Sequence, residues 1–403
     1  MNAKNFTILA IFTLLIVIAT VVIVIQEQPS TSSPVESLVF PKLVAKINDV
    51  TEIEVATKDE HFTLVKGDKH WGLQEKHQYP TAMDKVSQLI LGLAELKILE
   101  AKTANPDLYS KLGVEDITAE DAQSVLFTLK DNAGNPLASL IVGENQISKI
   151  DATRREFYLR KADDKQSWLA IGSLPVEKKP SQWLDKQIMD LDSARVQKVQ
   201  VIHPDGEKVT IFRDAKDNED YQLADLPEQM KIKSMYTLKQ MAGALTGLNM
   251  NDVTVSSEFE FAPEDSTQVV FTTFDGLEIT MTLTAHEDKH YAKFTAVFVP
   301  EMVKTDPEVK TDSTEEKLTP EQVKTEADSL QEQLKAWVFE IPAYKATALL
   351  KRQTDLVEAK PAEEVVDEVG NVSTSEPVDE MGEESTLPHF KLEDVLGQPV
   401  TVN

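Results

Sequence analysis

The sequence contains no cysteine among its 403 residues. This absence excludes disulfides, thiol catalysis, cysteine-ligated zinc sites and a lipidated N-terminal cysteine. Basic residues are also scarce, because 41 lysines and arginines stand against 68 aspartates and glutamates, for a formal charge of −27. Unaided binding to nucleic acid or to an anionic membrane surface needs basic patches, so the composition argues against both.

Motifs for several common chemistries are missing as well. The chain has no phosphate-binding glycine loop and no G-x-S-x-G nucleophile elbow. The acidic segment 214–220 lacks the ligand spacing and the glycine that a calcium loop requires. We therefore expect a protein that is not an enzyme and that has no catalytic, cofactor-binding or metal-binding residues.

One long hydrophobic run is present, at residues 6–25, and its only polar members are three threonines. Twenty helical residues at about 1.5 Å each span a hydrocarbon core of about 30 Å. The run is longer than the core of a typical signal peptide, and no small-x-small cleavage site follows it. We therefore predict an uncleaved transmembrane helix, with a cleaved signal peptide as the alternative.

The charges beside this run predict its orientation. Lys4 precedes it, whereas Glu27 and Glu36 follow it. The positive-inside rule then leaves the N-terminus in the cytoplasm and the bulk of the chain outside. The expected location is the cytoplasmic membrane, crossed once.

The rest of the chain is organised around a unit of roughly 120 residues that occurs twice. The apolar pattern of 50–55 recurs at 196–201, and that of 125–128 recurs at 269–272. Alternation of apolar and polar residues predicts strands. The expected strands lie at 51–56, 61–66, 70–73, 124–130, 137–142, 156–161, 167–171, 267–274, 278–285, 291–299 and 337–341.

Each copy is also expected to contain one amphipathic helix. In the first copy the apolar stripe predicts a helix over 83–99. The matching helix of the second copy would extend through Leu245 to Met250, with Gly243 and Gly247 allowing close packing on the sheet. Further helices are expected from Ser181 and over 343–351.

The predicted fold class is α+β, with an N-terminal transmembrane helix followed by two tandem repeated domains. Each domain would be an antiparallel sheet with a packed helix. The expected boundaries are 1–5 for the cytoplasmic N-terminus, 6–25 for the anchor, 26–44 for a stalk, 45–192 for the first repeat domain, 193–354 for the second, 300–332 for an acidic insertion within it, and 355–403 for an acidic disordered tail. The insertion is expected to be a solvated loop, with some helix near its end.

The sharpest candidate motif is His286-Glu287-Asp288-Lys289-His290, a literal H-E-x-x-H. On a helix this spacing places two imidazoles on one face to bind zinc, with the glutamate as general base. Here the motif lies between two alternating runs, which predicts a solvated hairpin turn. The other conspicuous side chains are expected to be exposed strand or turn histidines at 61, 70 and 77, and core tryptophans at 71, 168, 183 and 337.

Four segments recur in an order that resembles a known family. They are 105–113 (NPDLYSKLG), 141–144 (IVGE), 157–160 (FYLR) and 183–185 (WLD). With the anchor, they resemble a bacterial family catalogued only as a domain of unknown function, over about residues 45–260. The resemblance implies a single-pass envelope protein, often encoded beside the auxiliary and permease components of gliding-motility-type ABC transporters. It provides no functional residues.

These observations favour a non-catalytic, membrane-anchored envelope protein. It would act as an accessory or scaffolding subunit of an ABC-transporter-like complex, with a permease and an auxiliary subunit as partners. Two alternatives stay open. One is a zinc-dependent hydrolase that uses His286, Glu287 and His290, and the other is a binding module for an envelope glycan or lipid between the copies.

Overall fold

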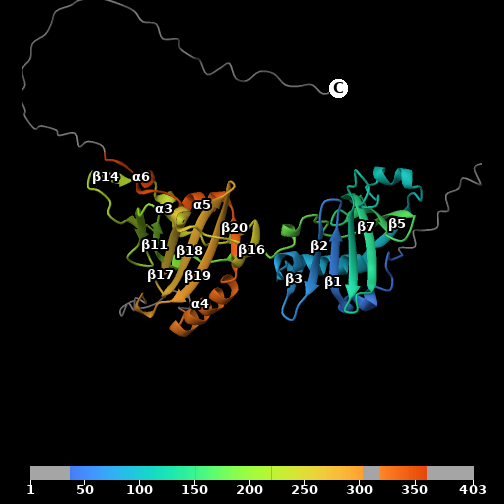
Figure 1. The fold of residues 1–403 in the computed structure, drawn as a ribbon, viewed down its shortest axis with the longest axis horizontal. Helices are drawn as coiled ribbons and strands as arrows, with labels where there is room; N and C mark the ends of the chain where they lie inside the picture. Colours follow the sequence, from blue (N-terminus) through green and yellow to red (C-terminus); the bar gives the residue numbers. More distant parts are fainter. Residues whose placement is uncertain (1–36, 150, 219, 303–317, 361–403) are drawn as a thin grey trace, which may run out of the picture. The chain divides into compact units, whose positions relative to one another are not determined.

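The structure, a computed structural model, describes residues 37–149, 151–218, 220–302 and 318–360 (Figure 1). Within these ranges the chain forms two large antiparallel sheets and two small two-stranded ones, with few helices. The α+β class expected from the sequence is therefore wrong. Strands predominate because the chain alternates apolar and polar residues over most of its length, and this period buries one face of a sheet.

The first sheet has nine strands in the described residues, in the order β4-β3-β2-β1-β6-β7-β8-β9-β5. Its alternation is clear in β1, which buries Ile53 and Val55 and leaves Glu52 and Glu54 on the other face. The strands are β1 (Val50–Ala56), β2 (His61–Lys66), β3 (Trp71–Leu73), β4 (Tyr79–Pro80), β5 (Lys97–Ala101), β6 (Val125–Asp131), β7 (Pro136–Ile147), β8 (Arg155–Lys161) and β9 (Ser167–Gly172).

The second sheet has eight strands in the described residues, in the order β13-β12-β11-β17-β18-β19-β20-β16. Strand for strand, β12-β11-β17-β18-β19-β20-β16 repeats β2-β1-β6-β7-β8-β9-β5. The strands are β11 (Val196–Ile202), β12 (Lys208–Phe212), β13 (Gln222–Leu223), β16 (Asp252–Val255), β17 (Thr267–Thr273), β18 (Leu277–His286), β19 (Lys289–Phe298) and β20 (Trp337–Ile341).

The repeat extends to a fine detail of the backbone. The register between β1 and β6 shifts between Val50 and Glu52, and the register between β11 and β17 shifts between Val196 and Lys198. Such irregularities bend the strand and are specific to their position. The self-similarity seen in the sequence is thus a repeat of topology and of local backbone geometry.

The remaining elements are short. Two small sheets pair β10 (Gln187–Met189) with β15 (Leu248–Asn249), and β14 (Met230–Ile232) with β21 (Val357–Ala359). The α-helices are α2 (Met83–Glu95), α3 (Met235–Ala242), α4 (Pro320–Leu334), α5 (Ala343–Leu349) and α6 (Gln353–Leu356).

Both repeat helices end earlier than their apolar spacing predicted. Helix α2 ends at Glu95, and Ile98 belongs to the edge strand β5. Helix α3 ends at Ala242, since Gly243 forms its C-cap and Gly247 adopts a positive φ of 53°. Apolar residues three positions apart occur in a helix and also in a turn followed by a strand. The apolar spacing therefore did not distinguish a longer helix from a helix that ends before a strand. The helix expected from Ser181 is only a 3₁₀ turn at Pro180–Gln182.

The predicted transmembrane helix is not supported. Among the described residues, no helix is both long enough and apolar enough to cross a bilayer. The run at 6–25 lies outside the described residues. Part of the expected stalk packs into the fold, because Val39 and Leu43 are buried and Val39 N–H donates to Leu96 O at 2.8 Å.

Two family-like segments meet at a close approach of backbone. The turn that ends in Gly113, at a φ of 63°, contacts β7 where Glu144 N–H donates to Leu112 O at 3.0 Å. A Cβ on Gly143 would lie 2.3 Å from that same carbonyl oxygen. These glycines therefore pack the turn on the sheet, and the resemblance they carry is one of structure.

The segment that joins the two sheets is buried where it contacts the first sheet. Trp183 is 0% exposed, and its carbonyl accepts a hydrogen bond from Ala82 N–H at 2.8 Å. The Tyr79 ring lies 5.0 Å from Trp337 and 6.2 Å from Phe339, both in the second sheet. One hydrophobic cluster therefore runs through residues of both repeats.

Residues 351–359 form a strap over the second repeat. Leu356 is buried, and β21 pairs with β14. Arg352 forms ion pairs with Glu207 and, at 2.8 Å, with Asp205 in the β11–β12 turn. The start of the expected disordered tail is thus ordered at 355–359, whereas 361–403 fall outside the described residues.

The strap is expected to open at acid pH before the sheets unfold. The pKa of Glu207 is lowered by the Gln353 N–H and then by Arg352, and the pKa of Asp205 is lowered by the Glu207 N–H and then by Arg352. Carboxylates with lowered pKa stabilise the folded form above their ordinary pKa, and this contribution is lost as pH falls through the lowered value. Hydrogen exchange of peptides covering 351–359, corrected for intrinsic rates, should accelerate from pH 5 to about pH 3.

Glu207→Gln is the matched variant for this prediction. This substitution should open the strap at neutral pH, and hydrogen exchange of the 351–359 peptides should then depend less on pH. Peptides from β17 and β18 serve as the internal control, since their exchange should follow global stability. Equal acceleration of strap and sheet peptides would contradict an independent opening.

Candidate functional site

The H-E-x-x-H motif forms a two-residue hairpin turn, as its flanking alternation predicted. His286, the last residue of β18, pairs with Lys289, the first of β19, and Ala285 pairs with His290. Glu287 and Asp288 adopt positive φ angles of 49° and 62°, which a type I′ hairpin turn requires.

This hairpin separates the two imidazoles. Residues paired across an antiparallel ladder share a face, and successive pairs face opposite sides. His286 and His290 belong to successive pairs and therefore point to opposite faces, unlike the shared helix face of a zinc hydrolase. The Glu287 side chain is 83% exposed. Within the described ranges, no group of three or more His, Asp or Glu side chains is arranged to hold a metal.

The three histidines of the first repeat are exposed, as expected for strand and turn positions. His61 begins β2, His70 precedes β3, and His77 lies in the loop before β4. His77 Nε2 is 3.2 Å from Glu258 Oε1, so it contacts the second repeat. The tryptophans occupy the core or its margin: Trp71 and Trp183 are buried, and Trp168 and Trp337 pack against the same cluster.

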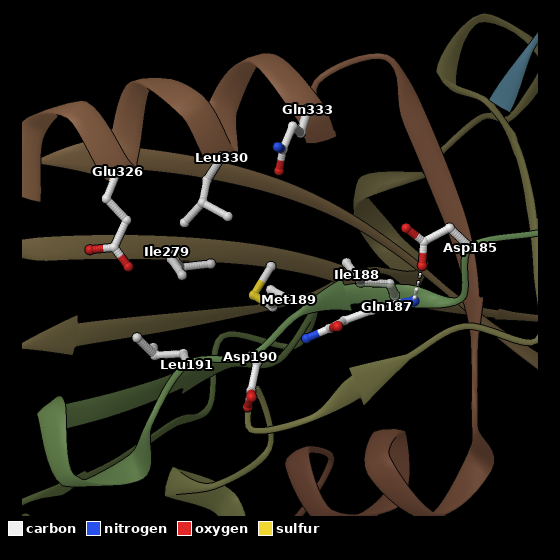
Figure 2. Close-up of a pocket in the computed structure, with 10 residues that line it drawn as sticks. All are labelled: Asp185, Gln187, Ile188, Met189, Asp190, Leu191, Ile279, Glu326, Leu330 and Gln333. Atoms are coloured by element: carbon white, nitrogen blue, oxygen red, sulfur yellow. Dashed lines mark hydrogen bonds between the residues drawn. The ribbon is translucent and has the colours of Figure 1, made fainter. Parts of the chain in front are cut away.

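A pocket of about 250 Å³ lies beside the segment that joins the two sheets (Figure 2). One wall is β10 with its flanking residues, another is α4, and Ile279 of β18 contributes from the sheet. Figure 2 shows Leu330 and Gln333 projecting from α4 toward β10, with Met189 among the apolar side chains. Its lining residues are Asp185, Gln187, Ile188, Met189, Asp190, Leu191, Ile279, Glu326, Leu330 and Gln333.

Helix α4 is positioned for this role by its local sequence. Thr319 and Gln322 form a capping box, and Pro320 occupies the first turn, where its missing N–H costs nothing. Val323 and Ala327 are buried toward the sheet. Gln331 Oε1 accepts the Ala296 N–H of β19 at 2.9 Å. The acidic insertion thus ends in a helix fixed on the second sheet.

An arginine fixes one end of the pocket. The Arg195 guanidinium donates to both Glu326 carboxylate oxygens at 2.8 Å and to Asp275 Oδ2 at 2.8 Å. Burial acts to lower the pKa of Arg195, but the hydrogen bonds that it donates to Glu326 and Asp275 outweigh burial, and the pKa is raised. This bidentate pair holds α4 at a fixed position over the sheet.

Asp185 is differently placed at the other side of the pocket. Its Oδ1 accepts a long hydrogen bond of 3.4 Å from Gln187 N–H (Figure 2). Its charge contributes, after burial, to the raised pKa of Tyr79. Among the residues that the structure describes, Asp185 has no ion-pair partner. The third carboxylate, Asp190, points away from α4 in Figure 2 and accepts the Gly247 N–H at 2.7 Å.

The lining of the pocket mixes apolar and polar side chains. It combines apolar side chains, two amides and carboxylates, and contains no serine, threonine, lysine or histidine.

Reasoning from the sequence missed this site entirely. In the sequence, Asp185 stands out only as part of the family-like segment 183–185, and the acidic pattern of 300–332 predicts mainly a solvated loop. The only local signal available was the Thr-Pro-Glu-Gln start at 319–322, a helix N-terminus pattern inside an otherwise acidic stretch.

Comparisons with known proteins add one match. No curated protein and no solved structure matches the chain. Residues 71–268 match a family model described as a domain of unknown function, DUF4340. The match runs from β3 to the start of β17, so it includes the β10 wall of the pocket and ends before Ile279 and α4. The chain therefore contains a DUF4340 domain at residues 71–268, consistent with the resemblance to a family of uncharacterised domains.

Proposed function

We propose that the protein is a non-catalytic accessory or scaffolding subunit of a bacterial envelope complex. The observation that carries this proposal is the pocket, whose lining combines Asp185 and two amides with apolar side chains, a composition suited to holding a partner. The hairpin geometry of residues 286–290 argues against the zinc-hydrolase alternative, because the motif's two imidazoles point to opposite faces.

The charged groups of the interior support the same conclusion. Arg160 donates to the Val114 and Asp164 carbonyls and to Asp116, and Arg213 donates to five backbone carbonyl oxygens. Both side chains are almost completely buried. Active sites usually hold charged groups with unsatisfied capacity toward a substrate, whereas these charges are used to hold loops in place.

The partner we propose is an ABC-transporter-like system, with its permease and an auxiliary subunit. The support is the resemblance of segments 105–113, 141–144, 157–160 and 183–185 to a family often encoded beside such systems. The net charge of −27 makes nucleic acid an unlikely electrostatic partner. The proposed location is the bacterial cytoplasmic membrane, with the folded sheets on the outer side.

Co-purification tests the proposed function. The tagged full-length protein would be purified from native membranes in mild detergent, and its companions identified by mass spectrometry. We expect stoichiometric recovery of a permease with its ATPase. Recovery of the protein alone would contradict the proposal.

Membrane association is tested separately. After cell fractionation, the full chain should be recovered with the cytoplasmic membrane and not in the soluble fraction. Protease added to spheroplasts should cleave the exposed hairpin at 286–290. Protection of that hairpin in intact spheroplasts would contradict the outward orientation.

A further inference from the structure

The pocket is built almost wholly from elements that lie outside the repeated sheets. Six of its lining residues belong to the segment between β9 and β11, and three belong to α4, which interrupts the β19–β20 connection. In the first repeat the corresponding β8–β9 connection is the short turn at 162–166. Only Ile279 comes from a strand of the repeated sheet. The pocket is therefore a feature of this second repeat, added to a fold that does not need it.

Its chemistry has two parts. Most of its accessible lining is polar, and Leu330 is the partly exposed apolar side chain, above the nearly buried Ile188, Met189, Leu191 and Ile279. Asp185 adds a carboxylate without an ion-pair partner in the described chain, while Glu326 is already neutralised by Arg195. The amides of Gln187 and Gln333 add hydrogen-bonding groups beside Asp185.

The volume limits what can enter. Drug-sized ligands occupy pockets of about 300–1,000 Å³, and this one is about 250 Å³. It therefore suits a single long side chain. Lysine and arginine pack their alkyl stems along apolar surface and keep their charged ends at the rim, which is the combination offered here.

We propose that this pocket receives a lysine or arginine side chain from a partner protein, with its cationic end on Asp185 and its stem against Leu330. Charge complementarity selects the occupant, since a chain of net charge −27 presents here a carboxylate without an ion-pair partner, in a pocket that Leu330 also lines. This assignment rests on the proposed function, because it names the contact through which the subunit would hold its partner.

Binding of short peptides to the full chain in mild detergent tests the chemistry. The probes are the acetylated, amidated tripeptides Leu-Lys-Leu, Leu-norleucine-Leu and Leu-Glu-Leu, and the readout is the ¹³C-methyl signal of Met189, assigned with Met189→Leu. We expect saturable shifts with the lysine peptide and at least about tenfold weaker binding of the other two, since loss of a charge-assisted hydrogen bond costs this much. Equal binding of the norleucine peptide would overturn the proposal.

Asp185→Asn should weaken binding of the lysine peptide about tenfold without changing the unfolding midpoint. Asp121→Asn, an exposed carboxylate of the first repeat, is the matched control and should bind normally. Spermidine tests a free polyamine as the source of the cation. Spermidine binding as tight as that of the peptide would overturn assignment to a protein side chain.

Co-purification with Asp185→Asn separates this inference from the proposed function. Companions that are recovered with the wild-type chain and lost with Asp185→Asn support both the proposed function and the pocket assignment. Companions recovered equally with both chains overturn the pocket assignment and leave the proposed function intact. A wild-type chain that recovers no companion overturns the proposed function and, with it, the partner assigned here.

Discussion

Trp183→Ala is expected to lower the free energy of unfolding by about 4 kcal/mol. The indole is fully buried, lies 6.3 Å from the Phe127 ring at 67°, and donates its N–H to Glu177 O at 3.1 Å. Alanine would leave a large cavity where the joining segment packs on the first sheet, and would orphan the Glu177 carbonyl. The effect should therefore be among the largest for a single substitution in this chain.

Urea unfolding followed by far-UV circular dichroism measures this effect, because the substitution removes a fluorophore and would distort a fluorescence signal. Trp183→Phe should lower the free energy of unfolding less than Trp183→Ala does, since phenylalanine keeps an aromatic ring, although it lacks the N–H donor. Tyr344→Ala is the control: this ring is 71% exposed, and its removal should change stability by no more than about 0.5 kcal/mol. A Trp183→Ala midpoint equal to that of the control would show that the joining segment does not contribute to the core.

Arg213→Met is expected to cost about 3–4 kcal/mol, because it removes a buried cation whose partners cannot be satisfied otherwise. The guanidinium is 4% exposed and lies 5.3 Å from the Tyr221 ring and 5.2 Å from the Phe274 ring. Its nitrogens donate to the carbonyl oxygens of Ser193, Ala194, Val196, Lys216 and Asn218 at 2.5–3.2 Å. Methionine would fill part of the volume and leave these carbonyls without donors.

Arg213→Lys distinguishes charge from geometry. An ammonium keeps the charge but offers three donors from one atom, so it cannot reach five carbonyls spread over two loops. We expect Arg213→Lys to recover less than half of the free energy of unfolding that Arg213→Met loses. Arg154→Met is the matched control, since Arg154 is exposed and pairs with Asp151 at 3.4 Å. Full recovery by lysine would contradict the hydrogen-bonding account, and hydrogen exchange over 193–220 would locate any loosening.

Arg213 and Arg160 show that buried charged side chains in this protein have a structural role. Arg213 holds the 193–196 turn and the 216–218 loop, and Arg160 performs the same kind of task in the first repeat, where it stacks 4.7 Å from Tyr109. Buried charges that donate to backbone carbonyls fix loop positions and leave little capacity for a substrate. Asp185 has no ion-pair partner among the described residues and lines the pocket, and for these two reasons it is the residue on which we place partner recognition.

Strand positions followed from the sequence because they depend on a local rule. Alternation at 278–285 and 291–299 placed β18 and β19 and located the hairpin between them, which settled the geometry of His286 and His290. Helix ends did not follow in the same way. Leu96 and Ile98 continue the apolar spacing of α2, yet they lie beyond its end at Glu95, where Ile98 joins the edge strand β5 on β9.

The sequence by itself determined the duplication, most of the strands and the core tryptophans, because each rests on spacing within a few residues. Only the tertiary structure decided the fold class, the closure of the strap by Arg352 and the pocket. Asp185 and Leu330 are 145 positions apart, and nothing in their neighbours indicates that they line the same pocket. That proximity is created by long-range pairing, namely β10 on β15 and α4 on β19, which no local pattern encodes.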